Sequence, residues 1–422
     1  MAGHASWRLQ LSDVLFVHNN FPAQFGFIAQ KLRSDGHRCA AIASETGRAL
    51  DGIQIEKWAT KRGTTEGILP SAVRIEADLI RGGAAALAAL KLKAEGFDPA
   101  LIIGHPGWGE TTYMREIFPN AKQIAYAEFY YRSVGGDVGF DPEFSPPNPD
   151  APYMLYAKNA GMTMAFSEAA AIVSPTPFQA SLLPEVFRSR ARIIHEGVDT
   201  AAIKPHSNPK VTLANGKVID GSRPLITFIN RRFEPLRGFH IFVRALPKFM
   251  AAVPDADVVI IGADERGGYG KPAEGKLTWG QQLFGEVADK LDRSRVHFVG
   301  RVPNPLMIEA LSLSSAHVYY TYPFVLSWSL LEAMATECLI LGSDTPPVRD
   351  AITDGVDGIL NDFFDIEALS DAMIAACKTP EKFKAMRKAA RQTILQRYDR
   401  ATICEPAWLK LVEPMLSPAS RH

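Results

Sequence analysis

Short apolar runs rich in β-branched residues alternate along this chain with longer segments of helical periodicity. Such strands, separated by helix-length segments, are typical of parallel sheets that helices cover on both faces. The pattern therefore predicts an α/β fold with two doubly wound, Rossmann-like domains. The runs begin at Val14, Leu101, Ile124 and Ala171 in the first series, and at Ile226, Val258, Val296, His317 and Leu339 in the second.

A segment rich in Pro, Asn, Gly and Ser, residues 204–224, lies between the two series and is interpreted as a connecting segment. It predicts an N-terminal domain over residues 1–205 and a C-terminal domain over residues 222–395. A length of 422 residues suits this division, since domains average roughly 150 residues. Because open α/β sheets bind ligands at the carboxyl ends of their strands, we expect the site in a cleft that the two domains face.

Composition excludes some classes of protein. Acidic and basic residues balance at 46 each, so no overall field draws the chain to nucleic acid. The four cysteines are scattered without metal-like spacing, and no run of about 18 apolar residues occurs. We expect a cytoplasmic protein with reduced thiols, and a peripheral contact at the inner face of the membrane stays open.

Two arginines lie where the second series begins. The run Leu225–Ile229 is predicted as a strand and Phe239 begins a helical pattern, so Arg232 and Arg237 are expected in the loop between them. Guanidinium groups beside a helix N-terminus suit a diphosphate, because they bind oxygens bidentately and the helix end adds partial positive charge. The alternative is that they are solvated or paired with a carboxylate such as Glu234.

The stretch YPFVLSWSLLEAMA, residues 322–335, predicts the start of another helix. Ser329 and Glu332 match a capping box, in which both side chains bond backbone NH groups of the first turn. In the functional alternative, the Glu332 carboxylate accepts hydrogen bonds from a ribose diol. Backbone NH groups of Ser327, Trp328 and Ser329 then face phosphate oxygens. The sequence leaves both interpretations open.

Polar residues also follow two strands of the first series. His105 comes directly after a strand, where parallel sheets place their ligands, although a loop carbonyl could equally satisfy its imidazole. The loop after the first strand, residues 18–25, contains asparagines that turn chemistry explains, and Pro22 is expected to begin a helix.

Several catalytic motifs are absent from the sequence. It contains no GxxxxGK[ST] phosphate loop, no GxSxG elbow and no HExxH pair. The acidic pair Asp264 and Glu265 lies in a glycine-rich loop, and no compact carboxylate cluster suits a metal. We therefore expect chemistry that requires no metal.

Motifs in both halves resemble one enzyme family. The segment from Asn230 to Gly238 is similar to a GRxxxxKG motif, with Arg237 at the lysine position. Residues 296–303 are similar to an FxGxV element, and residues 330–344 are similar to the signature LEAMAxGxPVVxSD. In the first half, residues 21–25 match an FPxQF loop and residues 97–110 an FDPxLIIGHPGWGE segment. Over nearly its whole length the chain resembles retaining glycosyltransferases of the GT-B fold, family 4, in a bacterial subset with the FPxQF loop.

The resemblance implies transfer of a sugar from a UDP- or GDP-linked donor to an acceptor hydroxyl, with the anomeric configuration retained. The acceptor would be a saccharide, a lipid-linked molecule or a small molecule, in bacterial polysaccharide or glycoconjugate synthesis. The nucleotide sugar would be a co-substrate, with no cofactor and no metal. The last helix, within residues 396–422, would cross back to the first domain.

The resemblance also assigns roles to residues. The candidate catalytic residues, which would hold and neutralise the donor diphosphate or lie beside the donor sugar, are Arg232, Arg237 and His105. The candidate donor-binding residues are Glu332, Ser327, Trp328, Ser329, Phe324, Gly300, Arg301, Val302 and Gly262. The candidate residues of the acceptor or diphosphate loop are Asn20, Phe21, Pro22, Ala23, Gln24, Glu128 and Tyr130.

The chain departs from the family pattern at two places. The family places a glutamate eight positions before the residue equivalent to Glu332, and here that position is Phe324. The usual glycine-rich turn after the first strand is replaced by Pro22, Ala23 and Gln24. Two alternatives therefore stay open: a nucleotide-sugar epimerase of GT-B shape, and an inactive sugar-binding scaffold. The sequence does not indicate the oligomeric state.

Overall fold

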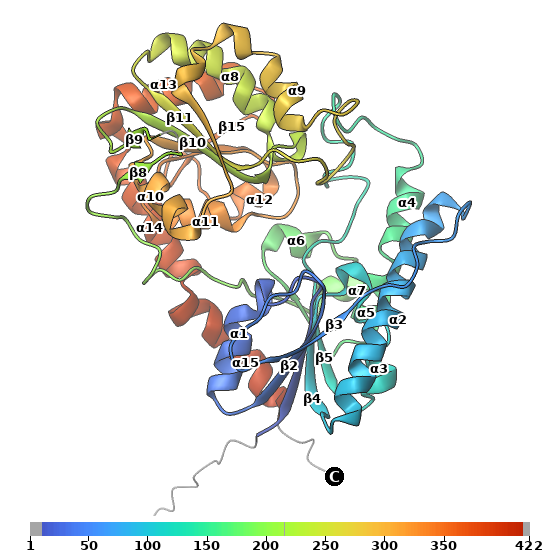
Figure 1. Ribbon diagram of the computed structural model, residues 1–422. Coiled ribbons are helices and arrows are strands. Elements are labelled where there is room, and N and C mark those ends of the chain that lie inside the picture. The colour runs from blue at the N-terminus through green and yellow to red at the C-terminus, as the bar shows by residue number, and fades with distance from the viewer. Residues whose placement is uncertain (1–10, 215, 417–422) are drawn as a thin grey trace, which may run out of the picture. The chain divides into compact units, whose positions relative to one another are not determined.

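The computed structural model describes residues 11–214 and 216–416, which divide into two compact units (Figure 1). The first unit contains the described residues up to Arg132, Pro149–Glu196 and the chain from Cys404 onward. The second contains Ser133–Asn148 and Gly197–Ile403. No helix among the described residues is both long and apolar enough to cross a bilayer.

The first unit is built on a parallel sheet, seven-stranded within the described residues, of order β3-β2-β1-β4-β5-β6-β7. Its strands are β1 (Asp13–Val17), β2 (Arg38–Ser44), β3 (Gln54–Trp58), β4 (Pro99–Gly104), β5 (Lys122–Tyr126), β6 (Ala171–Ser174) and β7 (Ala191–Ile193). The sequence analysis missed β2, β3 and β7. β3 mixes charged with apolar residues, because it is an edge strand.

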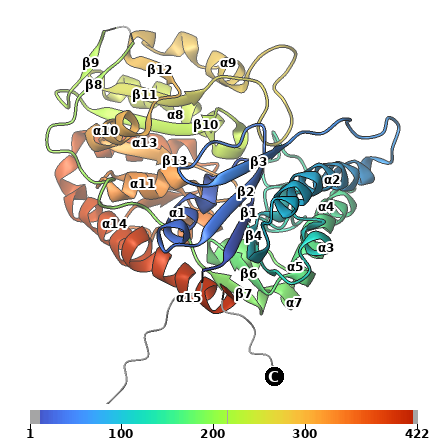
Figure 2. The ribbon, with the colours of Figure 1, turned by 60° about the horizontal axis from the view of Figure 1, so that its bottom comes forward.

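Helices cover both faces of this sheet. Alternate residues of β1 point to opposite faces, so Val14 and Phe16 pack with α1 and α15, whereas Leu15 and Val17 pack with α2 (Figure 2). The helices of the unit are α1 (Gly26–Ser34), α2 (Val73–Ala94), α3 (Met114–Ile117), α4 (Ala151–Lys158), α5 (Ala160–Glu168), α6 (Pro177–Ser181), α7 (Glu185–Arg188) and α15 (Glu405–Leu416).

The second unit holds another parallel sheet, six-stranded within the described residues, of order β12-β11-β10-β13-β14-β15. Its strands are β10 (Leu225–Arg232), β11 (Asp257–Ala263), β12 (Val296–Gly300), β13 (Ala316–Tyr319), β14 (Ile340–Ser343) and β15 (Ile359–Asn361). β10 is longer than predicted, so Arg232 ends the strand and does not lie in the following loop.

The helices of the second unit form two layers, with α8, α9 and α13 on one face of the sheet and α10, α11 and α14 on the other (Figure 1). The unit contains α8 (Phe239–Ala252), α9 (Trp279–Gly285), α10 (Asn304–Leu313), α11 (Trp328–Ala335), α12 (Pro346–Arg349), α13 (Ile366–Lys378) and α14 (Lys384–Arg397). Both units are thus parallel α/β sheets covered by helices, as the sequence predicts.

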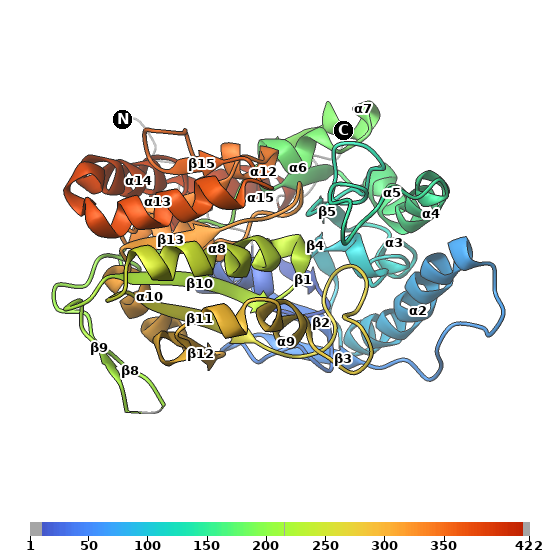
Figure 3. The same cartoon turned by 90° about the horizontal axis from the view of Figure 1, so that it is seen from above.

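The segment interpreted as a connection carries structure of its own. Residues 204–224 contain an antiparallel hairpin of β8 (Val211–Thr212) and β9 (Val218–Ile219), which lies beside α10 (Figure 3). The sequence analysis did not predict this hairpin within the connecting segment. Val211, Leu213 and Ile219 are buried in the core of the second unit, and this burial fixes the hairpin.

Candidate functional site

Three charged residues meet at the carboxyl ends of neighbouring strands in the second unit. Arg232 ends β10, Glu265 lies two residues after β11, and Arg301 directly follows β12. An Nη atom of Arg232 lies 2.7 Å from a Glu265 oxygen, and Arg301 pairs with the same oxygen. The Glu265 carboxylate shows that an anionic group fits between the two guanidinium groups.

Arg232 has unused donor capacity. Its Nε atom is buried and has no hydrogen-bond partner among the described residues. Its predicted alternative partner, Glu234, instead accepts a hydrogen bond from the Tyr269 backbone N at 2.6 Å. A buried charged donor without a partner is costly, so the Arg232 guanidinium has hydrogen-bonding capacity that the described residues leave unused.

The second arginine is held by the loop after β13. Arg237 lies in the short helical turn η4 (Pro235–Arg237), and its Nη1 donates to Thr321 Oγ1 at 3.1 Å and to the Val325 carbonyl at 2.8 Å. Gly238 follows with a φ of 68°, and a Cβ there would lie 2.3 Å from Tyr320 Cβ. Only glycine therefore allows α8 to begin directly behind Arg237.

Phe324, which replaces the family glutamate, packs beneath this arginine. Its side chain is buried, and its ring centroid lies 5.4 Å from the Arg237 guanidinium carbon and 4.8 Å from the Tyr269 ring centroid. A guanidinium over an aromatic face is attracted by the ring quadrupole. Phe324 therefore contacts both Arg237 and Tyr269.

The entrance of α11 differs from a capping box. Ser327 is the N-cap residue, and its hydroxyl accepts a hydrogen bond from the Ser329 backbone N. The Glu332 carboxylate instead accepts from Asn304 Nδ2 at 3.2 Å. Burial raises the pKa of Glu332, against the hydrogen bond from Asn304 and the charge of Arg400. The capping-box interpretation was wrong, and the carboxylate is not used by the helix terminus.

The backbone donors predicted to face phosphate are partly engaged. The Ser327 N–H donates to the Tyr319 hydroxyl at 2.7 Å, and the Ser329 N–H donates to Ser327 Oγ at 3.4 Å. Trp328 begins α11, and its side chain is 46% exposed. The three residues form one turn, but two of their backbone N–H groups already have partners.

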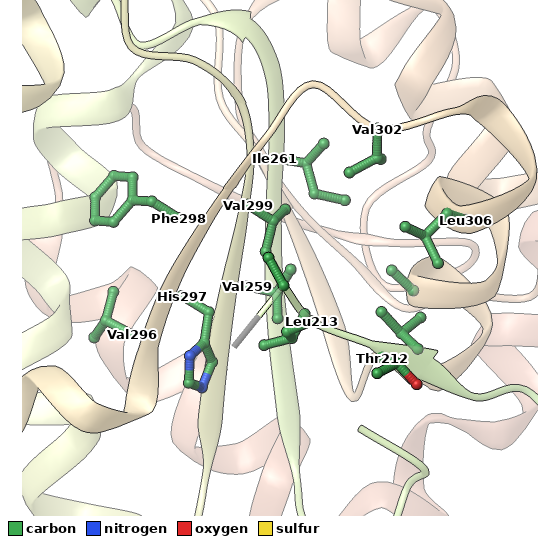
Figure 4. Close-up of a pocket in the computed structure, with 13 residues that line it drawn as sticks. Thr212, Leu213, Val259, Ile261, Val296, His297, Phe298, Val299, Val302 and Leu306 are labelled. Atoms are coloured by element: carbon green, nitrogen blue, oxygen red, sulfur yellow. The ribbon is translucent and has the colours of Figure 1, made fainter. Parts of the chain in front are cut away.

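A hollow of about 540 Å³ lies on the α10 face of the sheet edge, between β12 and the β8–β9 hairpin (Figure 4). Aliphatic side chains line it, among them Val299 and Val302 near the end of β12, Leu213 from the hairpin and Leu306 from α10. The predicted donor residue Val302 therefore lies in its wall. The predicted residues Gly300 and Arg301 precede Val302 directly.

The predicted donor residue Gly262 allows a close backbone approach between β10 and β11. It has a φ of 149°, and a Cβ there would lie 2.1 Å from the Asn230 carbonyl oxygen. A side chain at Gly262 would therefore collide with the backbone of the strand that carries Arg232.

In the first unit, four polar side chains form one network. His105 Nε2 lies 3.2 Å from Glu128 Oε2, while the other carboxylate oxygen accepts from Gln24 Nε2 at 2.6 Å. Gln24 Oε1 in turn lies 2.8 Å from His18 Nε2. Both histidines directly follow parallel strands, β1 and β4, which pair side by side in the sheet. The predicted residues His105, Gln24 and Glu128 are therefore brought together.

Both imidazoles of the network have a defined tautomer. Nδ1 of His18 accepts from the Asn20 backbone N at 2.9 Å, and Nδ1 of His105 accepts from the Gly107 backbone N at 3.1 Å. Each ring therefore carries its proton on Nε2 and donates toward Gln24 or Glu128. The Trp108 ring stacks on His105 at a centroid distance of 4.2 Å and fixes its plane.

Burial governs the titration of this network. It lowers the pKa of His18 to about 3, and the neighbouring His105 adds to the effect. Burial alone would raise the pKa of Glu128, but the hydrogen bond and charge of His105, with smaller contributions from His18 and Gln24, lower it overall. The network therefore combines an ionised carboxylate with a neutral His18 at pH 7.

Other predicted residues of the acceptor or diphosphate loop, both in the first loop and after β5, have structural positions. Phe21 is fully buried and packs on Phe16 at a centroid distance of 5.9 Å, so it belongs to the core. Pro22 precedes a short helical turn, η1 (Ala23–Phe25), and does not begin α1 itself. Tyr130 contacts α5, with its hydroxyl 3.2 Å from Thr163 Oγ1.

Two contributors were not predicted as site residues. His18 was noted only as part of a loop, although it follows a strand directly, as His105 does. Glu265 was noted as part of an acidic pair without a role, and its position after β11 would have placed it beside Arg232. Among the described residues, no group of three or more His, Cys, Asp or Glu side chains is arranged to hold a metal ion.

We expect His18 to make the fold sensitive to acid. Because its folded pKa is depressed below the ordinary 6.5, the unfolded chain binds a proton first, and stability falls as the pH drops from about 6.5 toward 3. Replacing His18 with Gln should reduce the slope of unfolding free energy against pH by up to about 1.4 kcal/mol per unit. Urea unfolding between pH 7 and pH 4.5 measures this, and profiles that stay parallel throughout would contradict it.

Solved structures share this architecture at low sequence identity. Sucrose-phosphate synthase from Thermosynechococcus elongatus superposes with a TM-score of 0.72 and 15% identity, covering 96% of this chain and 99% of that one. Anabaena HepE in complex with UDP-glucose gives a TM-score of 0.66 at 14% identity, with 95% and 99% covered.

Sequence relatives match part of the chain. A phosphatidyl-myo-inositol mannosyltransferase of Mycolicibacterium smegmatis is 26% identical over 226 residues, 52% of this chain and 51% of that protein. A D-inositol 3-phosphate glycosyltransferase of Kribbella flavida is 23% identical over 48% of this chain and 46% of that protein. The chain thus spans about half the length of the curated relatives it matches.

Two family models cover most of the chain between them. The model described as glycosyl transferase family 4 group matches residues 35–203, and the model described as glycosyl transferases group 1 matches residues 212–393. With the two parallel α/β units, these matches define a glycosyltransferase of the GT-B fold. Within that class, the chain belongs to the glycosyltransferases of family 4 type.

Proposed function

We propose that this glycosyltransferase moves a sugar from a UDP- or GDP-linked donor to an acceptor hydroxyl, with the anomeric configuration retained. The observation that carries the proposal is the buried Nε of Arg232, which has no partner among the described residues and lies in a guanidinium pair already bridged by the Glu265 carboxylate. A donor diphosphate would replace Glu265 between Arg232 and Arg301 and use the unpaired donor.

Each part of the donor has a proposed partner. Arg232 and Arg237, together with Arg301, hold the diphosphate and offset the charge that develops as it leaves. Glu332 Oε2, which makes no hydrogen bond within the described ranges, accepts from the ribose diol, while Asn304 orients the carboxylate through Oε1. The base lies beside Val302, against the aliphatic hollow at the sheet edge.

The proposed sugar transfer needs no side chain of the enzyme as a general base. The bond from the anomeric carbon to the leaving phosphate oxygen breaks as the bond from that carbon to the acceptor oxygen forms on the same face. The acceptor's proton passes to the leaving phosphate. We propose that cations supply the charge stabilisation and that no metal is required. We propose that the network of His105 and Glu128 in the first unit binds a sugar hydroxyl through its hydrogen-bonding groups.

The acceptor is proposed from the relatives alone. Two of the sequence relatives are named for transfer to inositol derivatives, which supports an acceptor that is a polyhydroxylated small molecule or its lipid-linked form. We place the reaction in bacterial polysaccharide or glycoconjugate synthesis on the cytoplasmic side of the membrane. The HepE complex with UDP-glucose supports a uridine donor as the first to test.

A panel of nucleotide sugars tests this proposal. The protein is incubated with UDP-, GDP- and ADP-sugars, with and without inositol and simple glycosides, in buffer containing EDTA. Release of nucleoside diphosphate that depends on an acceptor is the expected result. A changed sugar on an intact nucleotide would indicate an epimerase, and binding without either outcome would indicate a scaffold. Activity that EDTA abolishes would contradict the metal-independent mechanism.

Glu332→Gln should weaken nucleotide binding without weakening the fold. The carboxylate is not part of the α11 cap, so we expect little change in unfolding free energy, whereas affinity for the nucleoside diphosphate should fall by about 1.5 kcal/mol. Titration calorimetry and thermal unfolding without ligand measure the two quantities. Loss of stability with unchanged affinity would assign Glu332 a structural role.

A further inference from the structure

The segment Ser133–Asn148, here called the strap, comes from the first half of the sequence but belongs to the second unit. Two aromatic side chains hold it there. The Phe140 ring packs against Tyr322, Phe363 and Phe364 at centroid distances of 5.1, 5.2 and 5.4 Å. Phe144 packs against His240 at 4.8 Å. The strap is therefore an integral part of the fold of the second unit.

Between these rings, the strap inserts a buried carboxylate. Asp141 is 1% exposed, and its Oδ2 accepts a hydrogen bond from the Tyr322 hydroxyl at 2.5 Å. His240 Nε2 lies 3.1 Å from the same oxygen, and the Glu143 backbone N donates to Oδ1 at 2.9 Å. Burial alone would raise the pKa of Asp141, but the hydrogen bonds from His240 and Tyr322 lower it to about 2. The ionised Asp141 carboxylate is therefore the hydrogen-bond acceptor that holds the Tyr322 hydroxyl in place.

Tyr322 links this anchor to the proposed donor site. Its backbone N donates to the Leu236 carbonyl at 2.9 Å, one residue before Arg237. The flanking residues Thr321 and Val325 accept the two hydrogen bonds from Arg237 Nη1. The loop 321–325 therefore binds the backbone next to Arg237 and also the Arg237 guanidinium. Asp141 in turn holds the loop through the Tyr322 hydroxyl.

We propose that Asp141 is a positioning residue, which acts through the Tyr322 hydroxyl to fix Arg237 for binding the donor diphosphate. This inference rests on the proposed function of Arg237. A buried charge-assisted hydrogen bond between defined side chains restricts the loop more than ring packing alone, because it has both an optimal distance and a direction. Without it, the loop would retain its aromatic contacts but lose the restraint on Tyr322.

The strap offers a matched control at its outer edge. Glu143, two residues from Asp141, pairs with Arg244 through two hydrogen bonds of 2.7 Å. This ion pair fastens the same segment to α8, and within the described ranges neither side chain makes a hydrogen bond to the loop 321–325. Glu143→Gln should therefore loosen the strap without disturbing Arg237, which separates docking of the strap from positioning of the arginine.

The test compares Asp141→Asn, Tyr322→Phe and the double variant with Glu143→Gln, using calorimetric titration with UDP, GDP and ADP. Asp141→Asn and Tyr322→Phe should each raise the Kd of the nucleotide that the parent binds by about tenfold. The double variant should be no weaker than the weaker single variant, because both changes weaken the same interaction between Asp141 and Tyr322. Glu143→Gln should change Kd by less than about twofold.

Hydrogen exchange supplies a measurement that needs no nucleotide. Amides of residues 321–326 should exchange faster in Tyr322→Phe than in the parent or in Glu143→Gln. Because Tyr322→Phe removes only one hydroxyl, it keeps the proposal testable if Asp141→Asn fails to fold. If the parent binds nucleotide and the Kd is equal in Tyr322→Phe and Glu143→Gln, the positioning role of Asp141 is overturned, while the proposed function stands. A parent that binds none of the nucleotides would overturn the proposed function and the role that rests on it.

Discussion

Replacing Arg232 with alanine should weaken nucleoside diphosphate binding by about 2 kcal/mol, or roughly thirtyfold in Kd. The substitution removes the guanidinium at the end of β10, including the buried Nε that has no partner in the described part of the chain. It also leaves Glu265 with Arg301 alone. Calorimetric titration of the parent and Arg232→Ala with UDP and GDP measures the change.

The neighbouring residue provides the control for this result. Arg231 carries the same charge one position earlier, but its side chain is exposed. Arg231→Ala removes an equal charge and should change Kd by less than about threefold, since exposed charges are screened by solvent. Equal affinity in Arg232→Ala and the parent, or equal losses in the two variants, would contradict a specific diphosphate site at Arg232.

Replacing Trp408 with alanine should destabilise the first unit by about 3–5 kcal/mol. Trp408 is fully buried on α15, and its ring lies 6.4 Å from Tyr126 and 6.3 Å from Phe27. These contacts place the C-terminal helix in the core of a sheet whose strands come from the first half of the chain. Deletion of so large a side chain leaves a cavity that its neighbours fill only in part.

Urea unfolding monitored by circular dichroism measures this loss. Lys410→Ala is the control, because this residue is exposed on the same helix and should change the unfolding free energy by less than about 0.5 kcal/mol. A cost below about 1 kcal/mol for Trp408→Ala would mean that α15 is dispensable for the fold of the first unit. The His18 variant tests the pH dependence of stability in the first unit, and the Glu332 variant tests nucleotide binding in the second.

The replacement of the family glutamate by Phe324 now has a physical account. The aromatic ring lies under the Arg237 guanidinium and beside Tyr269, where a carboxylate would pair with the arginine directly. A cation over a ring retains its full charge toward a ligand, whereas an ion pair neutralises part of it. Under the proposed function, the donor sugar would have one acidic partner fewer, and the Arg237 charge would face the diphosphate without an ion-pair partner at position 324.

Much of the fold follows from local sequence signals. The continuous apolar runs predict strands correctly, because a strand buried on both faces needs apolar residues at every position. β3 was missed, because an edge strand mixes charged and apolar residues. The β8–β9 hairpin was missed because its turn residues resemble a linker, and only burial of Val211 and Ile219 reveals it.

The sequence by itself determined the two α/β series, the family resemblance, and the positions of Arg232, His105 and Glu332 near strand ends or a helix entrance. Only the tertiary structure decided their partners. Pairing of Arg232 with Glu265, of Glu332 with Asn304, and of His105 with Glu128 joins residues 23 to 33 positions apart. The link from Asp141 to Tyr322 spans 181 positions. Such contacts depend on strand order and on packing across the whole unit, and local periodicity carries no information about either.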